Sequence, residues 1–374
     1  MNFNEFSKEK LGKLIFVELN AEKFIEGLGG NAKELSINEL YIPINPKYLN
    51  EDVKKGYKLD KLPITYFIEG MFYAIGGDKN LRFNEAYFKI LPLIKDSVYC
   101  VKGIIADNVK KNNLADALIL LIGLWEYEGD KDVCDKALYV CEALREVNNE
   151  YNDVQLELAE RAKEKWGNEA FPYLYSSLAY KDKNELNKSF IEINEYLKNG
   201  GEKNSEIEAL YSEIKDALAY EEGKDALLED PNRALAKLLP LADKFPEDAI
   251  LKYYIGTCYR RIENFEKAIY YLNESLELNN NIVEVVNELG INYASLNDFD
   301  NAVKCFRKAF EATKDVEICT NLIMTYINMG DLDNAKKHLK LAEALNKDDE
   351  IVIEIKKYLE KMWYLFKVWW IIVI

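Results

Sequence analysis

The residues best suited to chemistry in this chain are few, and their spacing fits no common catalytic motif. The segment Gly27 to Lys33 (GLGGNAK) is rich in glycine, but it lacks the spacing and the hydroxyl of a phosphate-binding loop. His338 is the single histidine, so a metal site built from several histidines is excluded. No GxSxG nucleophile motif occurs. The sequence therefore predicts a non-enzymatic protein with no catalytic residue, no metal and no cofactor.

Six cysteines offer the other candidate chemistry, and none of them forms a CxxC pair. Cys134 and Cys141 are seven residues apart, a spacing that can place both on one face of a helix. We interpret the cysteines as small buried hydrophobic residues. A disulfide or a redox pair is the alternative.

The chain is acidic, with 49 Lys and Arg against 65 Asp and Glu and a formal net charge of −16. Because such a chain repels phosphate backbones, no nucleic-acid partner is expected. Residues 1–13 carry charges throughout and contain no long apolar run, so no signal peptide is expected. The cytoplasm is the expected location.

The elements that must position these residues are almost all helices. From about Pro63 onward, apolar residues recur at three- and four-residue spacing, and short polar or glycine breaks separate the segments. Short loops between such segments indicate antiparallel helix hairpins. The expected helices upstream of the repeats are 64–75, 84–94, 96–111, 116–128, 131–148, 153–165, 171–180, 186–197 and 205–228.

The first 62 residues have a different pattern. Two apolar runs of strand length, 14–19 (LIFVEL) and 40–44 (LYIPI), flank a glycine-broken segment. Pro43 marks a turn or a sheet edge. We expect a small irregular N-terminal cap with a short strand pair.

The strongest pattern is a repeat in the C-terminal half. Ala234, Ala268, Ala302 and Ala335 are spaced 34, 34 and 33 residues apart. Four residues before each lies an Asp or Asn suited to cap a helix, and four residues after each lies a Leu or a Phe. A fixed period of this size is typical of a solenoid of stacked helix pairs, in which small residues face bulky ones where helices cross.

The first helices of the last three units align as well. Each carries a matching apolar pair followed by a tyrosine three residues later: Ile255-Gly256 with Tyr259, Leu289-Gly290 with Tyr293, and Leu322-Ile323 with Tyr326. This pattern resembles the tetratricopeptide repeat over residues 215–347. The first-helix Trp of the family is absent, and its closing Pro occurs only as Pro246. The resemblance implies an all-α solenoid of stacked antiparallel hairpins that acts as a protein-interaction scaffold.

Upstream, residues 63–214 fit the repeat less well. One divergent unit is expected around Ser176, Ser189 and Tyr196, and another around Ile122-Gly123 with Ala137 and Cys141. We expect these helices to continue the stack as hairpins of the same type. A separate helical domain is the alternative.

The resemblance also implies that the first helices line a concave, partner-binding face. A carboxylate clamp of Lys and Arg is not present at the matching positions, whereas Glu284, Glu288 and Glu317 favour a basic or polar protein or peptide. A plain solvated surface is the alternative. The expected partner-binding residues are Tyr253, Thr257, Arg260, Asn287, Glu288, Ile291, Glu317, Asn321, Met324 and Asn328.

Residues 348–374 are expected to form a C-terminal capping helix with an apolar tail. Residues 362–374 (MWYLFKVWWIIVI) are apolar except for Lys367. At about 1.5 Å per residue the tail spans ~20 Å, which is shorter than the ~30 Å hydrocarbon core, so no membrane span is expected. We expect it to be buried in this chain or in a second copy. Contact with a membrane interface through Trp363, Trp369 and Trp370 is the alternative.

The sequence thus predicts four segments: the cap at 1–62, divergent hairpins at 63–214, clear repeats at 215–347 and the capping helix at 348–374. The leading hypothesis is a scaffold that binds a peptide or protein on its concave face. One alternative is a structural homo-oligomer assembled through the tail. Another is an enzymatic or regulatory N-terminal part that the repeats target, which would require a cleft with perturbed carboxylates.

Overall fold

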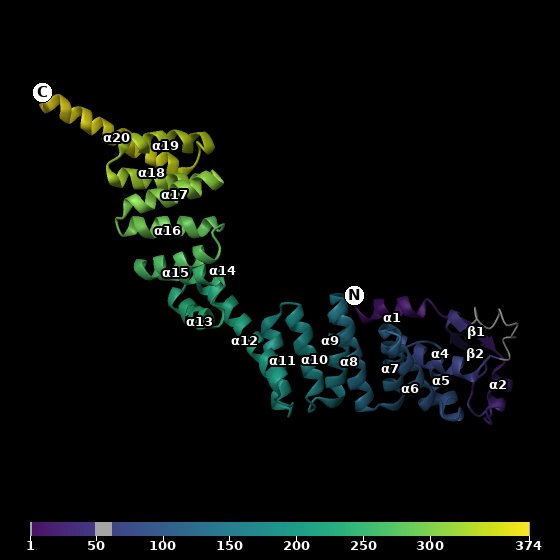
Figure 1. Ribbon diagram of the computed structural model, residues 1–374. Coiled ribbons are helices and arrows are strands. Elements are labelled where there is room, and N and C mark those ends of the chain that lie inside the picture. Colours follow the sequence, from purple (N-terminus) through teal and green to yellow (C-terminus); the bar gives the residue numbers. More distant parts are fainter. Residues whose placement is uncertain (1, 49–61, 374) are drawn as a thin grey trace. The chain divides into compact units, whose positions relative to one another are not determined.

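The structure is a computed structural model that describes residues 2–48 and 62–373, the side chains of 362–373 excepted. The described chain is almost entirely helical, with one two-stranded sheet (Figure 1). It divides into two compact units, Met1–Ile214 and Lys215–Ile374, and the division falls inside helix α12 (Ser205–Ala226). The all-helical fold with a short strand pair near the N-terminus is confirmed.

The first unit begins with two helices and two strands, α1 (Phe3–Leu11), β1 (Ile15–Leu19), α2 (Ala21–Gly27) and β2 (Leu40–Ile44). The strands pair antiparallel, with Phe16 opposite Pro43. The sequence analysis missed α1 and α2, which are nine and seven residues long. Each is started by an asparagine cap, Asn2 or Asn20, whose side chain accepts a backbone N–H of the first turn.

The expected helices of this unit are present with ends shifted by a few residues. Within them, α7 is buried along most of its length and shares one core with β2 and α4. The N-terminal strands are therefore part of the same core as the helices. The bounds are α4 (Ile64–Gly77), α5 (Asn84–Ile90), η2 (Leu91–Leu93), α6 (Ser97–Lys110), α7 (Leu114–Glu128), α8 (Lys131–Val147), η3 (Asn149–Tyr151), α9 (Asn152–Trp166), α10 (Phe171–Asp182) and α11 (Leu186–Lys198).

Helices α4 and α7 touch backbone to backbone. A Cβ atom at Gly123 would lie 1.9 Å from the Phe72 carbonyl oxygen, and one at Gly76 would lie 2.0 Å from that of Ile119. Gly123 therefore faces α4, which comes earlier in the chain, and not α8, which follows α7. This differs from the divergent repeat expected around Ile122-Gly123, in which the glycine would face α8.

Helices α10 and α11 form a hairpin that is closed by a reciprocal pair of buried serines. The Ser177 hydroxyl donates to the Ser189 carbonyl at 2.9 Å, and the Ser189 hydroxyl donates to the Ser177 carbonyl at 2.8 Å. Both residues are fully buried. Because serine is small, the two helices can cross closely. Both buried hydroxyl groups still donate a hydrogen bond to a carbonyl oxygen.

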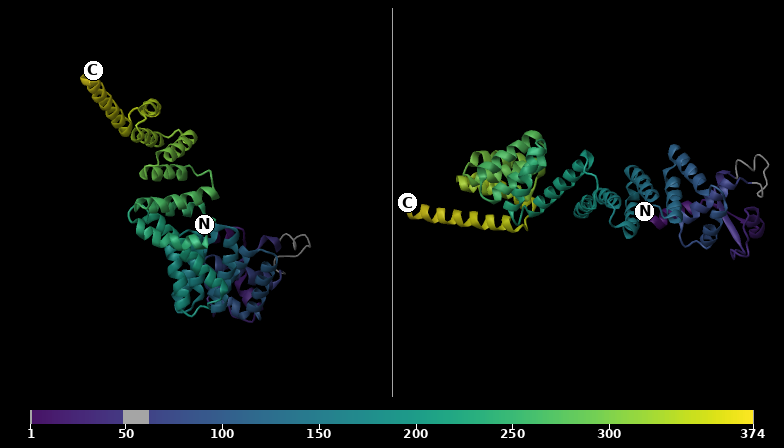
Figure 2. Two further views of the ribbon diagram at one scale, coloured as in Figure 1. Left: turned by 60° about the vertical axis from the view of Figure 1, so that its left-hand side comes forward. Right: turned by 90° about the horizontal axis from the view of Figure 1, so that it is seen from below.

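The second unit is a stack of hairpins (Figures 1 and 2). Each second helix opens at the predicted cap: the side chains of Asp230, Asn264, Asp298 and Asp331 accept the backbone N–H three residues on. The bounds are α13 (Pro231–Lys244), α14 (Ala249–Arg261), α15 (Phe265–Leu278), α16 (Val283–Ser295), α17 (Phe299–Thr313), α18 (Val316–Met329), α19 (Leu332–Leu345) and α20 (Glu350–Val373).

Glycines face bulky side chains in three hairpins of this unit, whereas Ile323 takes the equivalent position in the last one. The four repeat alanines are fully buried. Gly256 faces the side chain of Leu272, and Gly290 faces that of Phe306. Gly223 faces Leu238 in the same way, so the C-terminal half of α12 acts as the first helix of a further hairpin with α13.

The last helix closes the stack. Val352, Ile355 and Leu359 of α20 are buried in the same cluster as Leu339 and Ala342 of α19. The tail side chains on which the oligomer and membrane alternatives depend lie outside the described residues. Within the described part of the chain, we find no helix long and apolar enough to cross a membrane.

Candidate protein-interaction surface

The residues predicted to bind a partner lie on three neighbouring first helices. Helix α14 contacts α16, and α16 contacts α18, so the three form one continuous face. Their exposure differs, and it decides which of them a partner can reach. Exposed are Glu317, Met324 and Asn328; half-buried are Tyr253, Arg260, Asn287, Ile291 and Asn321; buried are Thr257 and Glu288.

One ion pair crosses this face between two helices. Arg260 Nε on α14 lies 2.5 Å from Glu288 Oε2 on α16, and Arg260 Nη2 lies 3.2 Å from Glu288 Oε1. The Glu288 side chain is 12% exposed and that of Arg260 is 25% exposed. Two parallel bonds of this kind fix both planar groups, so the pair holds neighbouring first helices in register.

The pair corrects the expected role of Glu288. The sequence pattern presents it as one of three free acids, but its charge is matched by Arg260 and its oxygens are used. Glu284 and Glu317 remain exposed. The acidity that this face offers to a partner therefore comes from these two residues.

Of the other predicted residues, Thr257 has an internal role and Asn287 has an oxygen that is unpaired within the described part of the chain. The Thr257 hydroxyl donates to the Tyr253 carbonyl at 3.0 Å, so it serves the helix that carries it. Asn287 has a buried Oδ1 that accepts no hydrogen bond from any described residue.

Three tyrosines gather at the α12 end of this face. The ring centroids of Tyr220 on α12 and Tyr254 on α14 lie 6.0 Å apart, and those of Tyr253 and Tyr254 lie 5.5 Å apart. All three are half-buried. The sequence analysis named only Tyr253. Alignment of the first helices would have found Tyr254, because it precedes Ile255-Gly256 as Glu288 precedes Leu289-Gly290.

Two apolar side chains also lie on this face. Ile291 on α16 and Met324 on α18 occupy equivalent positions, each directly after the matching apolar pair of its helix. Met324 is 44% exposed. A flexible, exposed thioether side chain suits contact with an apolar partner side chain.

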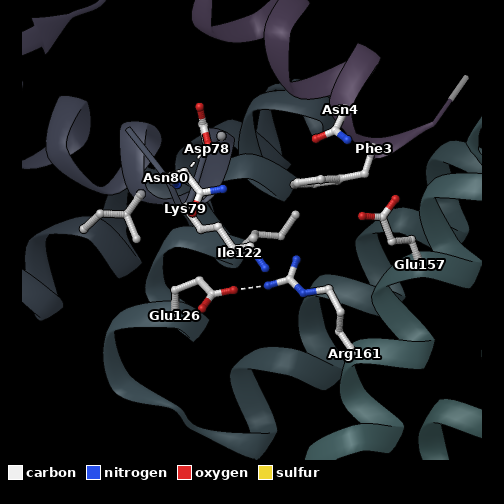
Figure 3. A pocket seen from close by; sticks show the side chains of 12 residues that line it. Phe3, Asn4, Asp78, Lys79, Asn80, Ile122, Glu126, Glu157 and Arg161 are labelled. Carbon is white, nitrogen blue, oxygen red and sulfur yellow. Dashed lines mark hydrogen bonds and ion pairs between the residues drawn. The ribbon is translucent and has the colours of Figure 1, made fainter. Parts of the chain in front are cut away.

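A small cleft in the first unit is the other candidate site (Figure 3). It has a volume of about 90 Å³ and lies between α1, the α4–α5 loop, α7 and α9. Arg161 of α9 forms an ion pair with Glu126 of α7, and its guanidinium lies 4.8 Å from the Trp125 ring centroid. Lys79 reaches the cleft from the loop.

The carboxyl groups of this unit whose pKa is raised lie outside the cleft. Burial raises the pKa of two carboxyl groups in this unit, Asp135 and Glu192. They belong to α8 and α11, and neither lines the cleft. The cleft also holds the ion pair between Arg161 and Glu126.

Cys134, Cys141 and His338 are packed within the fold. Cys134 and Cys141 are buried free thiols, and burial raises the pKa of Cys134 to about 12. Such a thiol stays protonated at neutral pH, which makes it a poor nucleophile. His338 Nδ1 lies 2.9 Å from the Asn334 carbonyl oxygen, and its ring packs against Tyr326.

The fold and this face define the second unit as an α-solenoid of stacked helix hairpins. The family model of the tetratricopeptide repeat matches three consecutive segments, 251–282, 283–315 and 316–349. The chain therefore carries three tandem tetratricopeptide repeats, and repeats of this family are in general protein-interaction scaffolds. No curated protein sequence matches the chain.

Solved structures of such proteins are similar to the chain at low identity. YrrB, described as a TPR protein with an unusual peptide-binding site, is 20% identical over 53% of this chain and 97% of its own, with a TM-score of 0.40. MamA from AMB-1 is 20% identical over 40% and 83%, with a TM-score of 0.37. The APC/C hetero-tetramer Cut9–Hcn1 is 13% identical over 80% and 65%, with a TM-score of 0.37.

Proposed function

We propose that the protein is a non-enzymatic scaffold of the cytoplasm that binds an extended peptide segment of a partner protein across α14, α16 and α18. The observation that carries this proposal is the face itself. It combines exposed acids, Glu284 and Glu317, with the half-buried amide of Asn321 and the exposed thioether of Met324.

The composition of the face favours a peptide over a small molecule. The contacting groups are spread over the three first helices α14, α16 and α18. An extended peptide can use each helix for one side chain, with amide side chains such as Asn321 free to bond its backbone. The exposed acids favour a partner that is basic or polar.

The test is selection of random twelve-residue peptides displayed on phage against the full chain, followed by synthesis of the enriched peptides. We expect Kd to rise about tenfold or more with either of two changes. Met324→Asp puts a hydrated carboxylate where an apolar side chain of the partner packs, and Glu317→Lys puts a positive charge against a basic partner. Glu311→Lys, an exposed substitution on the second helix α17, is the matched control and leaves Kd unchanged.

Two results would contradict the proposal. One is that no peptide is enriched. The other is that the enriched peptides bind the Met324 and Glu317 variants as tightly as they bind the original chain, which would place their site elsewhere.

A further inference from the structure

We propose that Tyr220, Tyr253 and Tyr254, together with the Glu284 carboxylate, form a subsite for one Lys or Arg side chain of the bound peptide. This inference rests on the proposed function, because the subsite lies at the α12 end of the same face. It adds the class of side chain that the face recognises and the place on the face where that side chain binds.

The tyrosine rings have the geometry that a cation needs. The planes of Tyr220 and Tyr254 are inclined by 59°, and those of Tyr253 and Tyr254 by 46°. Rings that are tilted in this way do not cover one another as stacked rings do, and all three side chains are only half-buried. A cation within about 6 Å of a ring centroid is attracted by the negative charge of that face.

The tyrosines themselves are neutral. Burial, followed by the influence of Tyr254 and Asp248, raises the pKa of Tyr220 to about 12. Burial also raises the pKa of Tyr253, and the Glu288 and Glu284 carboxylates add to that effect. All the formal negative charge near the rings therefore belongs to carboxylates, and two of these, Glu288 and Glu284, act on Tyr253.

Two basic groups near the cluster are paired with carboxylates. Arg260 is held by Glu288, and Lys224, one helical turn from Tyr220 on α12, pairs with Glu221 at 2.5 Å. Glu284 is exposed and makes no ion pair with any described residue. Glu284 therefore acts on Tyr253 as a negative charge that no described cation neutralises.

The tyrosine rings and the Glu284 carboxylate together favour one class of side chain. An acidic side chain of a peptide would meet Glu284 at close range, which is unfavourable. An apolar side chain would gain ring contact but nothing from the carboxylate. A lysine or arginine gains both, because its aliphatic stem packs on the rings while its charge faces Glu284.

The experiment uses the peptides selected above. We expect nearly all peptides that depend on Met324 to carry a Lys or Arg at one fixed distance from their apolar residue. Replacing that residue with norleucine, or changing Glu284→Gln, should raise Kd roughly two- to fivefold, and Tyr254→Leu should raise it roughly tenfold. The norleucine peptide should bind the original chain and the Glu284→Gln variant equally well.

Control variants keep the test independent of folding. Glu284 is exposed, so Glu284→Gln removes only a charge, and Glu266→Gln on the first turn of α15 removes one charge of the same sign at a distance from the rings. Circular dichroism and thermal melting check that Tyr254→Leu stays folded. Glu266→Gln should leave Kd unchanged.

The inference and the function on which it rests fail in different ways. One outcome is that peptides lose binding with Met324→Asp, carry no fixed Lys or Arg, and tolerate Glu284→Gln. That result overturns the subsite but not the proposal that peptides bind across α14, α16 and α18. If no peptide responds to the first-helix variants, the proposed binding face is wrong, and the subsite is wrong with it.

Discussion

Gly290 of α16 lies against the ring of Phe306 on α17, so closely that a Cβ atom added at Gly290 would lie 2.7 Å from Phe306 Cε1. The ring is 1% exposed and is enclosed by the core of the second unit, so it has little room to move aside. Gly223 and Gly256 face Leu238 and Leu272 in the same way, whereas this hairpin places a rigid Phe ring against its glycine.

The first prediction follows from this contact. Gly290→Ala should lower the free energy of unfolding by about 1 kcal/mol or more, because crowding costs about 1–3 kcal/mol and the helix preference of Ala returns only about 1 kcal/mol. Gly103→Ala on α6 is the matched control, since a Cβ atom there meets no other atom within 4 Å. It should stabilise the protein by roughly 0.5–1 kcal/mol. Urea denaturation measures both, and stabilisation by Gly290→Ala would contradict the packing described.

The second prediction concerns the ion pair between α14 and α16. Arg260→Ala and Glu288→Ala should each destabilise the second unit, and the double variant should lose less than the sum of the two. We expect a coupling energy of about 1–3 kcal/mol, because the bonds are charged, bidentate and largely shielded from water.

An exposed pair provides the comparison. Arg82 and Glu39 lie 2.7 Å apart, but their side chains are 75% and 60% exposed. Their double-mutant cycle should give at most about 0.5 kcal/mol. Equal coupling energies in the two cycles would mean that Arg260 and Glu288 do not hold the first helices together.

The third prediction concerns pH. Hydrogen bonds from the backbone and side chain of Asn334 lower the pKa of Asp331 below its ordinary value of 3.8. The ionised cap therefore stabilises the fold at pH values above about 4, and this contribution is lost as the pH falls through the lowered pKa.

Replacement of the cap by an uncharged one tests this. Asp331→Asn keeps a cap oxygen, as Asn264 does naturally in an earlier repeat, but it does not titrate. The original chain should be more stable than the variant from pH 5 to 7, and this advantage should shrink below about pH 4. Asp300→Asn removes an exposed acid from the first turn of α17 and controls for the lost charge. A difference that stays constant down to pH 3 would contradict the lowered pKa.

Local features explain why the repeats were predictable. A cap such as Asp298 acts on the helix that begins at the next residue, and Ala302 faces a partner helix in a hairpin that recurs with the same spacing. The repeat period therefore predicts the hairpins, the first residues of their second helices and their small packing residues. The same reasoning missed α1 and α2, because helices of nine and seven residues carry too few turns for a period to show.

What the sequence determined by itself is the architecture of the second unit, since capping and small-against-bulky packing act within one repeat length. Only the tertiary structure decided which groups on the first helices remain free. Arg260 of α14 neutralises Glu288 of α16, and Tyr220 of α12 approaches Tyr254 of α14. These contacts depend on the rotation of each helix about its axis and on side-chain reach, which residue spacing along the chain does not specify.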